Sequence, residues 1–236
     1  MGDFLAARWS SLAMLSWQVD PALLLPLVPD GTELDAHDGT TYASLVGFRF
    51  TGTRVLGLPV PGHRDFDEVN LRFYLRRRQD GAWQRGVSFV RELVPRRAIA
   101  WLARLRYNEP YLAVPMSSQV GDSEVVYRWQ APQGGWNALR VHPTGDWLLP
   151  DAASRDGWIA EHYWGWTRQR DGGTVAYRVE HPPWRIRAAS ASATEGDLAA
   201  TYGRVWAEAL AGPPASAFLA EGSPITVGHP RRLPRG

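Results

Sequence analysis

One segment of the chain alternates polar and apolar residues with the two-residue period of a β-strand. Its apolar positions, which fall on one face, are Val69, Leu71, Phe73 and Leu75, and its polar positions, which fall on the other, are Glu68, Asn70, Arg72 and Tyr74. The pattern predicts a strand over residues 66–77 with a buried apolar face. The polar face has two interpretations: it is exposed to solvent, as is common in antiparallel sheets, or it lines a polar cavity inside a barrel.

β-Structure is predicted for most of the remaining chain. We expect further strands at 12–19, 40–50 and 83–93, and hairpins that join 124–129 to 136–142 and 159–168 to 174–179 around glycine-containing turns. Helices are expected at 21–27, 95–106 and 199–210, where capping residues, prolines and glycines mark the ends. Together these elements predict a mainly β fold, a curved antiparallel sheet or barrel, with two or three helices.

We expect one domain over residues 1–223, because no internal repeat or interdomain linker interrupts it. Residues 224–236 are rich in Pro and Arg and are expected to form a poorly ordered C-terminal tail. The N-terminal residues lack the features of a signal peptide, and no apolar run approaches the roughly 18 residues that span a bilayer. A cytoplasmic protein without a membrane partner is therefore expected, and the sequence leaves open whether it forms a homo-oligomer.

The basic residues are of one kind only. All 26 of them are arginines, and the 236 residues include neither lysine nor cysteine. Disulfides, thiolate nucleophiles and cysteine-ligated zinc sites are thereby excluded. The formal net charge is only +2, and the arginine runs at 76–78 and 231–232 do not form the clustered positive patch typical of nucleic-acid-binding proteins. Nucleic acid is therefore not an expected partner.

Seven short motifs carry a family resemblance. They are Ala7-Arg8-Trp9, Leu27-Val28-Pro29, Val46-Gly47-Phe48-Arg49-Phe50, Phe66-Asp67-Glu68-Val69-Asn70-Leu71-Arg72, Arg91-Glu92-Leu93-Val94-Pro95-Arg96-Arg97-Ala98, Tyr107-Asn108-Glu109 and Glu161-His162-Tyr163-Trp164-Gly165. In combination they resemble the YqjF-like family of bacterial proteins, a domain of unknown function numbered 2071, over residues 4–219.

Two of these motifs also resemble, more distantly, the acetoacetate decarboxylase superfamily. The run from Glu68 to Leu71 is similar to a decarboxylase strand that carries a functional glutamate. The run from Arg91 to Arg97 is similar to a decarboxylase motif in which Arg-Glu is followed, after a longer spacer, by Pro-Lys-Lys. The resemblance implies the β-barrel of that superfamily with a buried pocket, and it places Glu68 at a functional position.

This chain departs from the decarboxylases at the reactive amine. In those enzymes the first lysine of the Pro-Lys-Lys motif attacks a ketone, and the second cation lowers its pKa. Here Arg96 and Arg97 stand in those places, and a guanidinium neither loses its proton in proteins nor offers a free lone pair. Because no lysine exists elsewhere in the chain, lysine Schiff-base chemistry is excluded.

Arg96 and Arg97 follow Pro95 at the expected start of a helix, where unpaired N–H groups concentrate positive potential. At roughly 6 Å in an effective dielectric near 20, the two cations repel by about 3 kcal/mol. A carboxylate can offset this cost. It is either internal, from Glu92 or Glu68 in a closed ion-pair network, or part of a bound ligand. The internal network favours a non-catalytic structural or interaction protein.

His162 is a candidate general acid or base because its pKa suits such a role, and a packed core histidine is the other interpretation. The six histidines show no metal-ligand spacing, so neither a metal site nor a cofactor is expected. The favoured hypothesis is a small-molecule-binding protein, or an enzyme without Schiff-base chemistry, that acts on an anionic carboxylate-bearing compound. Its candidate catalytic residues are Glu68 and His162, and its candidate ligand-binding residues are Arg96, Arg97, Glu92, Asn70, Arg72 and Tyr74.

Overall fold

A closed barrel of seven strands forms the centre of the computed structural model, which describes residues 3–60 and 62–234. Its strands are β1 (Leu5–Gln18), β3 (Tyr42–Val55), β5 (Phe66–Gln79), β6 (Ala82–Val94), β11 (Trp164–Arg168), β12 (Thr174–Glu180) and β14 (Ser216–Val227). They pair in the order β12-β11-β6-β5-β3-β1-β14, and β12 closes the ring by pairing with β14. Every pair in the ring is antiparallel except β6–β11, which is parallel.

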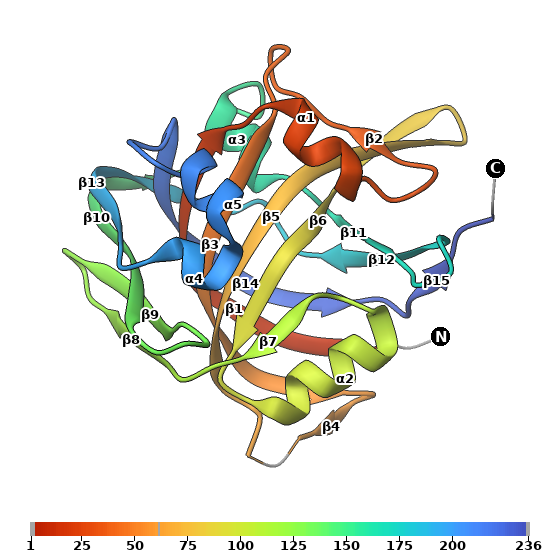
Figure 1. The fold of residues 1–236 in the computed structure, drawn as a ribbon, viewed down its shortest axis with the longest axis horizontal. Helices are drawn as coiled ribbons and strands as arrows, with labels where there is room; N and C mark the ends of the chain where they lie inside the picture. Colours follow the sequence, from red (N-terminus) through yellow and green to blue (C-terminus); the bar gives the residue numbers. More distant parts are fainter. Residues whose placement is uncertain (1–2, 61, 235–236) are drawn as a thin grey trace.

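A second set of strands continues from β14 along the outside of the barrel. These strands are β13 (Ile186–Glu195), β10 (Trp136–Leu148), β9 (Val125–Gln130) and β8 (Met116–Val120). The short strands β2 (Glu33–Leu34), β4 (Leu58–Pro59), β7 (Tyr111–Ala113) and β15 (Arg231–Arg232) extend other barrel strands. Figure 1 shows β8, β9, β10 and β13 on one side of the molecule, opposite the β11–β12 hairpin.

Five α-helices occur in the described residues, rather than the two or three expected. They are α1 (Pro21–Leu24), which continues as a short 3-10 turn at Leu25–Leu27, α2 (Arg97–Tyr107), α3 (Arg155–Ala160), α4 (Leu198–Tyr202) and α5 (Arg204–Ala209). Asp20 caps α1 as expected, since its carboxylate accepts a hydrogen bond of 2.8 Å from the Ala22 amide. None of these helices is long and apolar enough to cross a membrane.

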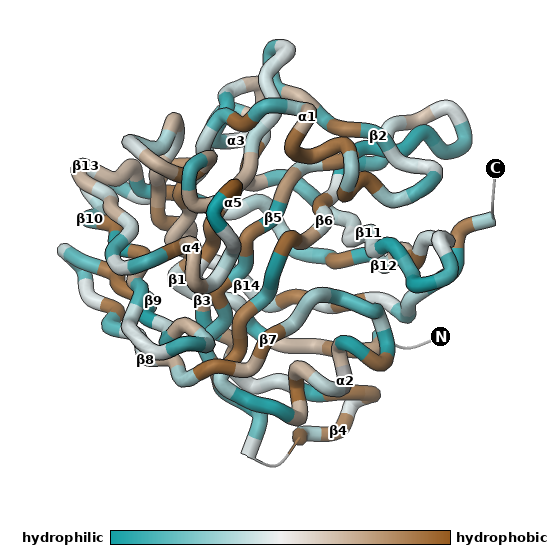
Figure 2. Tube along the Cα trace, viewed as in Figure 1, coloured by the Kyte–Doolittle hydropathy of each residue, from teal (hydrophilic) through white to brown (hydrophobic). Residues whose placement is uncertain are grey.

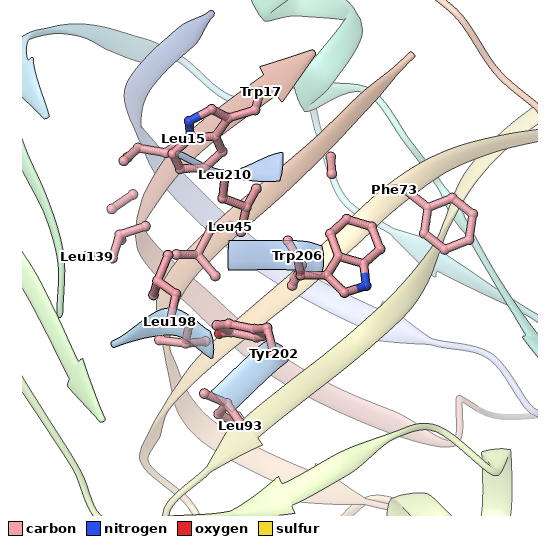
Figure 3. Close-up of a cluster of buried hydrophobic side chains, with 14 of the residues drawn as sticks. Leu15, Trp17, Leu45, Phe73, Leu93, Leu139, Leu198, Tyr202, Trp206 and Leu210 are labelled. Carbon is pink, nitrogen blue, oxygen red and sulfur yellow. The ribbon is translucent and has the colours of Figure 1, made fainter. Parts of the chain in front are cut away.

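The largest hydrophobic core lies outside the barrel wall, between the barrel and the structures that cover it. Leu45, Phe73 and Leu93, from three adjacent barrel strands, face outward into this core. They pack with Tyr202 of α4 and Trp206 of α5, which Figure 3 shows together with the neighbouring leucines. The apolar face of β5 therefore points away from the barrel axis, as the burial of Val69, Leu71, Phe73 and Leu75 in the same core requires.

The polar face of β5 consequently points into the barrel. Glu68, Asn70, Arg72 and Tyr74 are all buried, so this strand is covered on both sides. Figure 2 shows the resulting interleaving of hydrophobic and hydrophilic residues along the central strands. The interpretation of this face as solvent-exposed is thus wrong, and the polar side chains belong to the barrel interior.

Among the boundaries that differ from the sequence predictions, three change the type or the continuity of an element or extend the fold past residue 223. The expected strand at 159–168 begins instead with the end of α3, whose first turn is capped by Ser154 through a 3.1 Å bond from the Gly157 amide. The expected helix at 199–210 is split at Gly203, whose φ of 86° is incompatible with a continuous helix. The expected tail boundary at 223/224 falls within β14, which continues to Val227, and β15 then pairs with β12.

Gly47 fixes how closely the outer sheet approaches the barrel. A Cβ at this position would lie 2.5 Å from the ring of Tyr127 on β9, a fully buried residue whose hydroxyl donates to the Ser11 carbonyl at 2.8 Å. We predict that Gly47→Ala lowers the free energy of unfolding by about 1–3 kcal/mol, because neither backbone nor ring has room to move. Urea denaturation measures this change.

Gly228→Ala is the matched control, since its added Cβ would meet no heavy atom closer than 3.5 Å. Equal stabilities of the two alanine variants would show that the contact between Gly47 and Tyr127 does not constrain the packing.

Candidate functional site

The barrel encloses a cavity of about 150 Å³. Each of the seven barrel strands contributes at least one side chain to its lining, and α2 contributes Ile99, Ala103 and Tyr107. Most of the lining is aromatic or aliphatic, and β5 supplies three of its polar side chains, Glu68, Asn70 and Arg72. An engineered cavity of similar size holds a benzene molecule, so this cavity has room for a small organic compound.

Arg72 is a buried cation without a carboxylate partner among the described residues. Its exposed fraction is 9 %. One guanidinium nitrogen donates to the Ile159 carbonyl at 3.4 Å and lies 3.9 Å from the sulfur of Met14, while Nε is buried without any hydrogen bond. Moving a charge out of water costs several kcal/mol unless an opposite charge offsets it. Arg72 is therefore the group on the cavity wall with the strongest tendency to bind an anion.

His162 lies beside Arg72 and also lines the cavity. Its Nε2 is 3.7 Å from the Asp35 carboxylate, to which Arg85 donates a 2.8 Å hydrogen bond. The imidazole packs against the ring of Tyr74, with 4.6 Å between the centroids, and neither of its nitrogens forms a hydrogen bond with a described residue. Burial lowers the pKa of His162 to about 4, against the opposing effect of Asp35, so the ring is neutral at pH 7.

Three buried glutamates gather at another part of the cavity lining, and we call them the glutamate cluster. Glu68 comes from β5, Glu92 from β6 and Glu109 from the residues that precede β7, with exposed fractions of 3 %, 2 % and 5 %. Asn70 and Tyr111 each donate a 3.3 Å hydrogen bond to Glu68. Oε2 of Glu92 is buried and receives no hydrogen bond from a described residue.

Burial raises the pKa of every member of the cluster, and repulsion from neighbouring carboxylates raises it further for Glu68 and Glu92. Burial raises the pKa of Glu68 to about 8, with a further contribution from the charge of Glu109. The pKa of Glu109 rises to about 7, mainly through burial. Burial and the charges of Glu109 and Glu68 raise the pKa of Glu92 well above its usual value of 4.5. The cluster therefore retains protons at neutral pH.

Gly165 makes room for the tyrosine that holds Glu109. A Cβ at Gly165 would lie 2.2 Å from the ring of Tyr177. The hydroxyl of Tyr177 donates a hydrogen bond to Oε1 of Glu109, and the hydroxyl of Thr167 lies 3.5 Å from the same oxygen. A side chain at position 165 would displace Tyr177, so glycine here positions one member of the cluster.

Arg96 and Arg97 do not reach this cavity. Both are exposed, and neither forms an ion pair or hydrogen bond with a described residue, so neither an internal glutamate nor the cavity faces them. Arg96 precedes α2 with an extended backbone. Arg97 is two residues from Ile99, which at about 100° per residue places it on nearly the opposite side of the helix from the cavity-lining stripe. The cation that faces the cavity is Arg72.

The other sequence candidates are close to one another. Glu68, Glu92, Asn70, Arg72 and His162 all line the cavity. Tyr74 is the exception, because its hydroxyl shares a 2.5 Å hydrogen bond with Ser44 and its ring is buried against His162 and Trp158. Tyr74 thus packs against His162 without lining the cavity itself.

Sequence reasoning missed four residues of the site: Asp35, Glu109, Tyr111 and Tyr177. Glu109 was present in the Tyr107-Asn108-Glu109 motif, but no strand periodicity surrounds it. Asp35 lies between short elements, and only the fold brings it to His162, 127 positions further along the chain. No local sequence signal identifies either of them.

Comparison with known structures identifies the fold. The acetoacetate decarboxylase of Legionella pneumophila is similar with a TM-score of 0.72 and 11% sequence identity, over 99% of this chain and 88% of that chain. The enduracididine biosynthesis enzyme MppR complexed with pyruvate has a TM-score of 0.69 and 14% identity, over 99% and 92% of the two chains. The barrel therefore has the acetoacetate decarboxylase-like fold, as the sequence resemblance implied.

Sequence comparison leads to a family. The uncharacterized protein YqjF of Bacillus subtilis (strain 168) is 28% identical over 200 residues, which are 83% of this chain and 80% of that protein. The family model DUF2071, described as an uncharacterized conserved protein, matches residues 6–224. Because that match covers nearly the whole chain, including most of every barrel strand, the chain belongs to the DUF2071 family.

Proposed function

We propose that this protein binds a small carboxylate-bearing molecule inside its barrel, with Arg72 as the counter-ion. The observation that carries the proposal is the burial of Arg72 on the cavity wall without a carboxylate partner among the described residues. A planar guanidinium presents parallel N–H groups that match a carboxylate, and such charge-assisted pairs are about twice as strong as neutral hydrogen bonds. A ligand carboxylate would offset the desolvation cost of Arg72.

The size and chemistry of the cavity favour a short compound. A cavity of about 150 Å³ with mostly apolar walls suits a few carbon atoms beside the charged group. MppR, which has a similar fold, is described as complexed with pyruvate, a carboxylate of this size. For this chain, the similarity in fold supports only the choice of pyruvate as a probe, because the reactive lysine of the decarboxylases has no counterpart here.

A catalytic role is the second candidate, and it rests on acid and base groups that line the same cavity as Arg72. Glu68 holds a proton at neutral pH, and His162 is neutral, so one is available as an acid and the other as a base. Pairs of titratable groups whose environments push their pKa values apart are typical of acid–base sites. In this proposal Glu68 and His162 are the catalytic residues, and no covalent imine is formed.

A purely structural role for the arginines has less support. It required Arg96 and Arg97 to be neutralised by internal carboxylates, and both are exposed to solvent instead. Solvent screens their mutual repulsion, so these two residues do not require a carboxylate partner and give no evidence for one.

Replacing Arg72 by methionine separates binding from stability. We predict that Arg72→Met weakens pyruvate binding at least tenfold, because a charge-assisted hydrogen bond contributes about 1.5–3 kcal/mol. The unliganded variant is expected to be at least as stable as the wild type, since a buried unpaired cation is removed. Isothermal titration calorimetry and thermal unfolding measure the two effects.

Arg91→Met is the matched control. Arg91 lies on β6 opposite Leu71, is half-buried, and does not line the cavity. Pyruvate, acetoacetate and acetate are tested on all three proteins. Retained binding by Arg72→Met, or an equal loss in Arg91→Met, would contradict the proposed role of Arg72.

The stability of the unliganded protein is expected to fall as the pH rises from 6.5 to 8.5. The pKa values of Glu68 and Glu109 are raised in the folded state, so the stability that their protons contribute is complete below 4.5 and is lost toward pH 8. The lowered pKa of His162 affects the pH dependence of stability only below pH 6.5. Each group contributes up to about 1.4 kcal/mol per pH unit.

Urea denaturation at several pH values measures this slope. Glu68→Gln should reduce the slope, whereas Glu180→Gln, at an exposed position on β12, should leave it unchanged. A wild-type stability that is flat over this pH range would mean that the glutamates do not hold protons in the folded state.

A further inference from the structure

Arg72 and the glutamate cluster lie at neighbouring positions along the same cavity. Glu92 lies directly opposite Asn70 across the β5–β6 pair, and Asn70 is two residues from Arg72 on β5. Alternate residues on one strand face are about 6.6 Å apart. The two charged regions are therefore separated by the length of one small molecule, and the side chains of both line the cavity.

The carboxyl groups of the glutamate cluster have no cationic partner among the described residues. None of Glu68, Glu92 and Glu109 forms an ion pair within the described part of the chain, and their hydrogen-bond donors are the neutral groups of Asn70, Tyr111, Tyr177 and Thr167. Oε2 of Glu92 has no donor at all among these residues, although it is buried. A buried acceptor without a donor is costly, and an ammonium group supplies three donors and a positive charge.

Apolar side chains flank Asn70 and Arg72 on the neighbouring strands. Val46 lies opposite Asn70 on β3, and Phe89 lies opposite Arg72 on β6. Both line the cavity, as does Val87. These side chains suit methylene groups, and the polar group between the two regions is Asn70, whose Oδ1 is buried without a hydrogen bond from a described residue.

We propose that the ligand is a short zwitterion, whose carboxylate pairs with Arg72 and whose ammonium group binds the glutamate cluster through Glu92. Its two charged ends are separated by a methylene chain of about 6 Å, the spacing of one strand repeat. This inference rests on the anion-binding function proposed above and adds the second charged group.

A metal ion is a less suitable occupant of the cluster. Within residues 3–60 and 62–234, no three His, Asp or Glu side chains are placed to hold one metal ion together. An ammonium group requires only hydrogen bonds of ordinary length to separate acceptors.

Binding of the zwitterion is coupled to proton release. The ammonium favours ionised glutamates, so protons held by the cluster leave when the ligand binds. The other titratable groups that face the cluster are Tyr107 on α2, Tyr111 on β7 and Tyr177 on β12, and burial raises the pKa of all three further above 10. They do not exchange protons between pH 6 and 8.

The test compares 4-aminobutyrate with butyrate and butylamine by isothermal titration calorimetry of the full chain. We expect 4-aminobutyrate to bind at least tenfold more tightly than butyrate at pH 8. Its affinity should increase from pH 6 to pH 8, with proton release detected in buffers of different ionisation enthalpy. Butyrate should show neither effect, and butylamine, which lacks the carboxylate, should bind more weakly than 4-aminobutyrate.

Glu92→Gln tests the second contact directly. This variant should bind 4-aminobutyrate no more tightly than it binds butyrate, and Glu68→Gln provides an independent variant if Glu92→Gln fails to fold. Glu180→Gln, on the same barrel but outside the cavity lining, should behave as the wild type.

Two negative results are distinguishable. Equal affinities for butyrate and 4-aminobutyrate, both lost in Arg72→Met, would overturn the zwitterion and leave the anion-binding function standing. Absence of binding by every carboxylate probe would overturn both.

Discussion

The arrangement of the site depends on the cost of holding a guanidinium in an apolar barrel. Arg72 is nine-tenths buried, and the folded chain supplies no carboxylate for it among the described residues. Three glutamates lie in the same cavity, yet their hydrogen-bond donors are neutral side chains, and none of them pairs with this cation. A cation and ionisable carboxyl groups that are kept apart inside one cavity keep their capacity to bind a ligand, whereas a closed ion pair would have none.

The outer sheet is what makes this interior possible. A β-strand has two faces, and β5 uses its apolar face for packing on the outside, against α4, α5 and the covering strands. The inner face therefore does not form the main hydrophobic core, and it can carry polar and charged side chains. One face of these strands packs in the hydrophobic core that stabilises the barrel, and the opposite face lines the cavity.

The sequence predicted the elements better than their contacts. The alternation of β5 identified both faces correctly, but hydropathy alone does not show which face is inside when both are buried. The cations at Arg96 and Arg97 were the natural candidates because of their motif, and a helical rotation of two residues removes Arg97 from the cavity. Asp35 and His162 meet only through the fold, so no spacing rule finds them. The Gly203 break and the capped start of α3 were local signals that the strand and helix patterns concealed.

The β11–β12 hairpin is joined to the barrel by unusually little backbone pairing. Two residue pairs connect β11 to β6, and two connect β12 to β14, whereas eleven connect β1 to β14. Local opening requires the least free energy where the fewest hydrogen bonds are broken. This hairpin carries Trp164 and Tyr177, which line the cavity. Opening of the barrel at this hairpin would break the fewest strand pairings, and the rate at which the hairpin separates would set an upper limit on how fast a molecule enters or leaves by that route.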